Sequence, residues 1–333
     1  MTRRRLIIDC DPGHDDFAAI ALAATSVGLE IEAITTVCGN APIERTTANA
    51  LAIVGALGVP IPVYSGAVAP LLQRYEFPAA FHGVTGLDSV GATLPPPRQG
   101  VTPGHAALEI IARVNAAPGE ITLVALGPMT NLALALALDP DVATKVRELV
   151  FMGGGLSGGN VTARAEFNVW ADPEAAALVL RSGIKATMFG LDVTNRAWLD
   201  GDDLARLKAA VAAPNPVSDI IQFYTERSGD VAAGRAPGPS LHDTCPVAWL
   251  VDPTLFETES LPVTVDTTGG PHYGATDADR RPWAPPHHQR IDVALELDQP
   301  RLARLVTDAL IDVAKRIANQ AQVAESLTRN ALG

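Results

Sequence analysis

Four aspartates crowd the stretch between residues 9 and 16, which reads Asp-Cys-Asp-Pro-Gly-His-Asp-Asp. The apolar run 6–8 before it predicts a buried strand, and the apolar residues 17–23 after it predict a helix. Carboxylates packed into one strand-to-helix turn repel one another unless a cation lies among them. Helix capping would explain one or two of these side chains, but not all four. The stretch therefore favours a hard divalent metal bound by oxygen atoms.

Two later segments could add polar groups to such a site. His242 and Asp243 precede an apolar helix, and Asp243 alone would be read as an ordinary N-cap. Paired with a distant metal cluster, it becomes a candidate last ligand with a neighbouring imidazole. Glu166 and Asn168, with Asn160 upstream, carry carboxylate and amide groups suited to vicinal hydroxyls. Taken alone this signal is weak, because Asn in a Gly-rich loop is most often a turn residue.

Strand and helix patterns alternate along the chain. Strands are predicted over residues 6–9, 31–37, 61–64, 121–126, 149–152, 186–190, 261–265 and 291–297. Helices are predicted over 17–23, 43–57, 104–115, 129–138, 173–182, 200–213, 216–229, 247–251 and 301–324. Long loops are predicted over 69–100, 229–239 and 271–286. This order predicts an α/β fold with an open, mainly parallel central sheet and helices on both faces.

The predicted sheet would gather the polar segments at one edge. Ligands of open α/β sheets bind beyond the carboxyl ends of the strands. Polar or glycine-rich residues follow five of the first six predicted strands, at 9–11, 38–40, 127–131, 152–155 and 192. We therefore expect one active site at the C-terminal ends of the strands, within a single domain over residues 1–333.

Composition narrows the class of partner. The chain has 333 residues and a formal net charge of −12, with a sequence pI near 5.0. This charge disfavours nucleic acid and anionic membranes as partners, so a small molecule is expected. Three cysteines without framework spacing predict buried, reduced thiols, and no targeting segment is recognisable, so a cytoplasmic protein is expected.

In their order along the chain, these motifs resemble the nucleoside hydrolase family, the ribohydrolases that prefer inosine and uridine or pyrimidine nucleosides. The resemblance covers nearly the whole chain. It rests on residues 9–16, Cys38-Gly39-Asn40, His82-Gly83, 126–131, 152–155, Asn160, Glu166-Phe167-Asn168 and His242-Asp243.

The resemblance implies an N-glycosidic hydrolase that releases ribose and free base, holds one Ca²⁺ per chain and forms a homodimer or homotetramer. The implied metal ligands are Asp11, Asp16, the backbone carbonyl of Leu126, and Asp243. The implied substrate contacts are Asp15, Asn40, His82, Met152, Asn160, Glu166, Phe167 and Asn168. Asp11 would take the proton from the attacking water, and His242 would assist departure of the base. Base preference does not follow, because the base-facing loops vary within the family.

Two other classes of protein share part of this pattern. A phosphatase of the haloacid-dehalogenase type also has Asp-x-Asp after its first strand. Its motif requires Thr or Val two residues past the second Asp, where this chain has Gly13. A non-catalytic sugar-binding protein would not need the cluster of aspartates.

Overall fold

The computed structural model describes residues 3–72, 82–281 and 289–332. Its strands form one sheet in the order β3-β2-β1-β4-β5-β6-β9-β7-β8. They are β1 (Arg4–Cys10), β2 (Leu29–Thr36), β3 (Val63–Ser65), β4 (Ile121–Ala125), β5 (Glu148–Met152), β6 (Ala186–Phe189), β7 (Phe256–Val265), β8 (Thr276–Ala278) and β9 (Arg290–Leu297). Neighbouring strands pair in parallel from β3 to β9, and the two pairs that β7 makes, with β9 and with β8, are antiparallel. The predicted open, mainly parallel sheet is confirmed.

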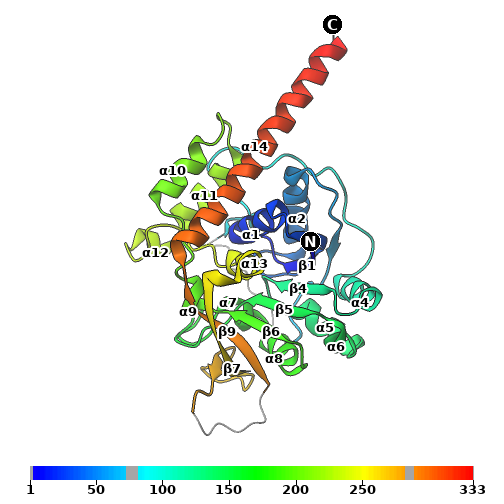
Figure 1. The fold of residues 1–333 in the computed structure, drawn as a ribbon, viewed down its shortest axis with the longest axis vertical. Coiled ribbons are helices and arrows are strands. Elements are labelled where there is room, and N and C mark those ends of the chain that lie inside the picture. Colours follow the sequence, from blue (N-terminus) through cyan, green and yellow to red (C-terminus); the bar gives the residue numbers. More distant parts are fainter. Residues whose placement is uncertain (1–2, 73–81, 282–288, 333) are drawn as a thin grey trace.

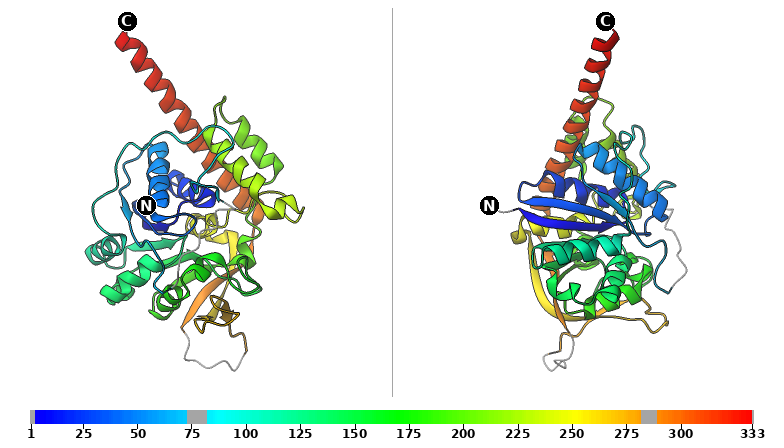
Figure 2. Two further views of the ribbon diagram at one scale, coloured as in Figure 1. Left: turned by 180° about the vertical axis from the view of Figure 1, so that it is seen from behind. Right: turned by 90° about the vertical axis from the view of Figure 1, so that its right-hand side faces the viewer.

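Helices cover both faces of this sheet (Figure 1; Figure 2, right). One face carries α1 (His14–Thr25), α2 (Ile43–Leu57), α10 (Gly201–Ala209), α11 (Pro216–Arg227), α13 (Thr244–Val251) and the first part of α14 (Gln299–Leu332). The other carries α4 (Ala106–Ala116), α5 (Thr130–Leu138), α6 (Val142–Lys145), α7 (Phe167–Ala171) and α8 (Pro173–Arg181). The far end of α14 projects from the body (Figure 1). Among the described residues, no helix combines the length and apolar character that crossing a membrane requires.

Strand β1 shows why the apolar run near the start forms a central strand. Leu6 and Ile8 pack into the core on the α1 side, whereas Ile7 packs into the core on the α5 side. Successive side chains of a strand point to opposite faces, so a strand covered on both faces must be apolar throughout. All three side chains are fully buried.

The chain order places the site. From β1 the chain moves outward to β2 and β3, and then crosses back to β4 on the other side of β1. The loops after β1 and β4 therefore leave the sheet in opposite directions and open a crevice between them, which is where open α/β sheets bind ligands. Asp11 follows β1 and Leu126 follows β4. The predicted position of the site, at the carboxyl ends of the strands, is thus the topological switch point.

Some predicted element bounds were wrong. The helix predicted over 200–213 ends at Ala209, because Asn215 turns back to donate to the Leu207 carbonyl at 2.9 Å. The loop predicted over 229–239 begins with a short helix, α12 (Gly229–Ala232), capped by the Ser228 side chain. The strand predicted to begin at residue 261 begins at Phe256. Residues 257–260 are polar and exposed, so they carry no apolar pattern that would predict a strand.

The other long loops are described in part. The stretch predicted as irregular over 271–286 contains β8, which pairs with β7. Residues 73–81 of the loop predicted over 69–100, and residues 282–288, lie outside the described residues. The remaining short elements are α9 (Leu191–Thr194) and a 3₁₀ turn at Pro253–Leu255.

Candidate active site

The turn from β1 into α1 folds its aspartates inward. The Gly13 N–H donates to Asp16 Oδ2 at 2.8 Å, which fastens the start of α1. A Cβ at Gly13 would lie 2.6 Å from His82 Nδ1 and 3.0 Å from Asn40 Nδ2, so glycine is what lets these neighbouring loops approach. Asp15 and Asp16 stand in the first turn of α1, where the helix dipole favours negative charge.

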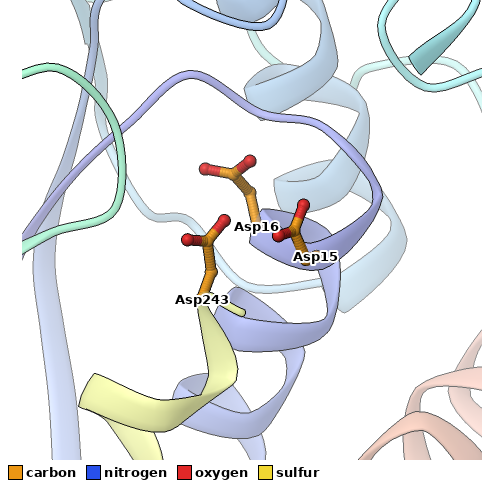
Figure 3. Close-up of side chains that lie close together, drawn as sticks. All are labelled: Asp15, Asp16 and Asp243. Carbon is orange, nitrogen blue, oxygen red and sulfur yellow. The ribbon is translucent and has the colours of Figure 1, made fainter. Parts of the chain in front are cut away.

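Asp243 joins these two carboxylates from the start of α13 (Figure 3). One oxygen from each of Asp15, Asp16 and Asp243 lies within 4.8 Å of the others, and all three side chains are buried. Asp243 stands at the N-cap position of α13, yet its side chain makes no capping hydrogen bond. Helix capping therefore does not account for Asp243. Asp11 lies outside this group of three, although its charge acts on Asp243.

The electrostatics of the cluster fit a bound cation. Burial raises the pKa of Asp11, Asp15, Asp16 and Asp243 above the ordinary aspartate value, and the charge of Asp16 adds to the effect at Asp11 and Asp15. Asp11 Oδ1 and Asp16 Oδ1 are buried with no hydrogen-bond partner among the described residues. No Lys or Arg occurs among the described residues that line the pocket. Buried carboxylates without cationic side chains suit a hard divalent metal, and this donor set contains neither Cys nor His.

Asn40, which follows β2, braces the carboxylates. Its N–H donates to Asp11 Oδ2 at 2.6 Å. Its side-chain Nδ2 lies 3.3 Å from both the Asp11 carbonyl and Asp16 Oδ2. The backbone N–H and the side-chain amide of Asn40 therefore orient Asp11 and Asp16, two of the predicted metal ligands.

The segment before α7 closes another wall. Asn168 Nδ2 donates to the Leu126 carbonyl at 2.8 Å and to the Met152 carbonyl at 3.2 Å, joining the loops after β4 and β5. Glu166 accepts from the N–H groups of Asn168 at 2.9 Å and Gly154 at 2.8 Å. The Glu166 carboxylate thus caps α7 as well as lining the pocket.

Asn160 also has a structural partner. Its Oδ1 accepts from the Phe167 N–H at 3.0 Å, which ties the glycine-rich loop to the start of α7. Asn160 and Phe167 both line the pocket.

Imidazole rings occupy another part of the site. His242 Nδ1 lies 2.9 Å from Thr194 Oγ1, and His82 Nδ1 lies 3.2 Å from His14 Nδ1. The Tyr224 ring stacks on His82 with centroids 5.6 Å apart. Burial lowers the pKa of His242 to about 4 and that of His82 to about 3, so both rings are neutral at pH 7.

These groups surround one cavity of about 210 Å³. The predicted site residues that line it are Asp15, Asn40, His82, Leu126, Met152, Asn160, Glu166, Phe167, Asn168, His242 and Asp243. Asp11 and Asp16 are buried and do not line it. Lining residues that sequence reasoning missed are Val161, Asn195, Tyr224, Ser228, Gly229, Asp230 and Ser240. Most of these lie on α11, α12 or short turns, whose sequences carry no motif, so only their position in the fold reveals them.

Two acids singled out in the sequence lie apart from the cluster. Asp9 Oδ1 accepts from Thr35 Oγ1 at 2.6 Å and Asn131 Nδ2 at 2.8 Å, so it braces the sheet instead of joining the group of three. Asp192 accepts from the backbone N–H groups of residues 156–157 and does not line the cavity.

An α/β sheet with a carboxylate-rich cavity at its switch point, walled by amide and imidazole groups, is suited to bind a divalent metal and a small polar substrate. Comparison with known proteins narrows the class of protein. The model of the inosine-uridine preferring nucleoside hydrolase family matches residues 6–304, and the chain belongs to this family. It is an enzyme that hydrolyses ribonucleosides to ribose and free base, and the phosphatase and sugar-binding alternatives are not supported.

Individual relatives span nearly the same length. The pyrimidine-specific ribonucleoside hydrolase RihB of Escherichia coli K12 is 38% identical over 279 residues, which are 84% of this chain and 88% of that protein. The structure of a purine-preferring ribonucleoside hydrolase from Gardnerella vaginalis has 33% identity and a TM-score of 0.86, covering 93% of this chain and 99% of its own. A plant nucleoside hydrolase has 32% identity and a TM-score of 0.83, covering 92% and 99%.

Proposed function

We propose that the carboxylate cluster holds one Ca²⁺, with Asp11, Asp16, Asp243 and the Leu126 carbonyl as its protein ligands. The observation that carries this is the pair of buried oxygens, Asp11 Oδ1 and Asp16 Oδ1, that have no partner in the described part of the chain. The Leu126 carbonyl already accepts from Asn168, but a carbonyl oxygen has a second lone pair. When bound, the ion would position the attacking water and make it more acidic.

Asp11 is then the group that takes the proton from this water. Its Oδ2 accepts from the Asn40 N–H at 2.6 Å and its Oδ1 has no partner among the described residues, so the carboxylate keeps lone pairs for both the ion and the water proton. The remaining carboxylates favour the positive charge that develops on the sugar as the glycosidic bond breaks. In the buried cavity this stabilisation is stronger than it would be in water.

The amide-rich wall binds the ribose hydroxyls. Asp15, Asn40 and Asn168 line the cavity beside the acid cluster. They offer carboxylate and amide oxygens as acceptors for vicinal hydroxyls, since the NH₂ groups of both asparagines already donate to protein oxygens. Asn160 and Glu166 are assigned to the same wall, where each also holds its own loop in place.

His82 and His242 lie on the base side and assist departure of the base, with Met152 and Phe167 completing the lining. The named relatives include one pyrimidine-specific and one purine-preferring enzyme, so both classes of nucleoside belong in the test.

The assignment is tested by elemental analysis and kinetics together. Protein purified without added metal should contain calcium near one ion per chain. Removing it with a chelator should abolish release of ribose from uridine, cytidine, inosine and adenosine, and Ca²⁺ should restore it. Zinc or iron in the site, or full activity without metal, would refute the proposal.

We also propose a domain organisation, an oligomeric state and a cellular location for the protein. We expect one domain over residues 1–333, in line with a sheet that combines strands from both ends of the chain. The resemblance to the family supports a homodimer or homotetramer, which light scattering would test. The three cysteines are free and buried, which fits a reducing cytoplasm.

A further inference from the structure

The hydroxyl of Thr194, at the end of α9, has only one hydrogen-bond partner among the described residues. That partner is His242 Nδ1, at 2.9 Å, and Thr194 is fully buried. If the ring donated from Nδ1, the hydroxyl hydrogen of Thr194 would be buried without an acceptor, which is costly. The hydroxyl therefore donates to Nδ1, and the ring proton of His242 sits on Nε2.

His14 holds the second histidine of the pocket, His82, in the opposite tautomer. His14 Nε2 lies 2.9 Å from the Asp88 carbonyl, which can only accept, so His14 carries its proton on Nε2. His14 is fully buried, stacks on the Phe223 and Tyr224 rings and has no ion-pair partner among the described residues, so a second ring proton would leave an unpaired buried charge. Its Nδ1 is then a bare acceptor, and His82 must donate to it from Nδ1 across 3.2 Å. This leaves Nε2 of His82 without a proton.

We propose that Thr194 and His14 are positioning residues that lock the two pocket histidines in opposite tautomers, so that His242 offers an N–H donor and His82 a bare nitrogen acceptor to the base. Neither residue that sets the tautomers lines the cavity. Within the described chain, His242 Nε2 and His82 Nε2 have no hydrogen-bond partner. Neither atom is among the unpartnered side-chain atoms that are buried from solvent. Both Nε2 atoms are therefore available to substrate.

The tautomer decides how His242 can act. A neutral ring with its proton on Nε2 donates a hydrogen bond to the leaving base and stabilises the negative charge that grows on it. It does this without giving up the proton, so no imidazolate has to form. The inference rests on the proposed placement of the base beside His242, and it deepens that role by adding the two residues that maintain it.

The tautomers can be read directly by two-bond ¹H–¹⁵N spectra of ¹⁵N-histidine protein at pH 7.5, assigned with His82→Gln and His242→Gln. The proton should appear on Nε2 of His242 and on Nδ1 of His82. The reverse assignment for either ring, or a doubly protonated ring, overturns the proposal. Because this measurement needs no turnover, it stays informative even if the proposed metal or base roles fail.

The kinetics of Thr194→Val test whether the hydrogen bond that fixes the His242 tautomer contributes to departure of the base. With uridine and inosine, kcat should fall about tenfold or more, as expected for loss of a hydrogen bond that orients a buried donor. With p-nitrophenyl riboside, whose leaving group is already a stable anion, kcat should stay within about threefold of wild type. Thr194→Ser keeps the hydroxyl and should restore the nucleoside rate.

Thr122→Val is the matched control, because it removes a buried Thr hydroxyl that has no partner among the described residues and lies on β4, outside the cavity lining. Its rates should equal those of wild type on both kinds of substrate. Equal losses by Thr194→Val on nucleoside and aryl riboside, or failure of Thr194→Ser to recover, would show that Thr194 only supports the fold.

Discussion

Adding one methyl group at Gly127 should disable the enzyme without unfolding it. Gly127 follows β4, and a Cβ built there lies 2.5 Å from Asp11 Oδ1 and 2.9 Å from its Cγ. A carbon and an oxygen rarely approach closer than about 3.3 Å, so the Asp11 carboxylate would have to retreat by about 0.8 Å. Asp11 is held on its other side by the Asn40 N–H, so the displacement strains that contact too.

The cost follows from the sensitivity of catalysis to position. A misplacement of about 1 Å can lower the rate by about 100-fold, so kcat of Gly127→Ala should fall between about 30- and 100-fold. The backbone of Gly127 is not in the left-handed region, so alanine itself adds no backbone strain. The melting temperature should therefore change much less than the rate.

The assay is steady-state hydrolysis of uridine and inosine, with thermal unfolding and bound calcium measured on the same preparations. Gly201→Ala is the control, because a Cβ at that position in α10 meets no atom within 4 Å. A Gly127→Ala enzyme that keeps more than half of the wild-type kcat would refute the argument that Asp11 must stay where it is.

Four further outcomes are expected. Asp11→Asn should lower kcat by about 1000-fold or more, since it removes both a ligand and the base, and a mutant keeping a tenth of the rate would assign the proton to another group. Deoxyinosine and deoxyuridine should have kcat/KM roughly 10⁴-fold below the ribonucleosides, because a site built for a hydroxyl leaves its polar groups unpaired without it; comparable values would exclude the ribose contacts. Thr122→Val and Thr307→Val should each raise the free energy of unfolding by about 1 kcal/mol, since both hydroxyls are buried without partners in the described chain. Urea unfolding measures this change, and a lower free energy of unfolding in either variant would contradict the prediction. Metal-free protein should lose stability relative to its Asp9→Asn variant as pH rises from about 4 to 7, because burial raises the pKa of Asp9 to about 7 and the folded state then holds a proton that the unfolded state releases; an equal pH dependence of the two urea midpoints would contradict this.

Local sequence determined most of the long helices and strands and the chemical identity of the acid cluster. The apolar run of β1 could only be a covered strand, and the residues after it could only be a turn rich in carboxylates. Asp243 was assigned to the metal on its resemblance to a family motif, and the structure brings it beside Asp15 and Asp16. Strand and helix periods depend on near neighbours in the chain, which is why they can be read without the fold.

Tertiary structure decided which way each polar group faces and what it binds. Asp9 belongs to the same sequence motif as Asp15, yet it turns to Thr35 and Asn131, because both are brought beside it only when the sheet forms.

The partners of the pocket histidines were equally hidden. Thr194 lies 48 residues from His242, and His14 lies 68 residues from His82. No local pattern marks such pairs, since a hydrogen bond between distant residues depends on how α9, α13 and the first loops pack. The sequence therefore determined which groups could do the chemistry, and the fold alone decided which of their atoms face the substrate.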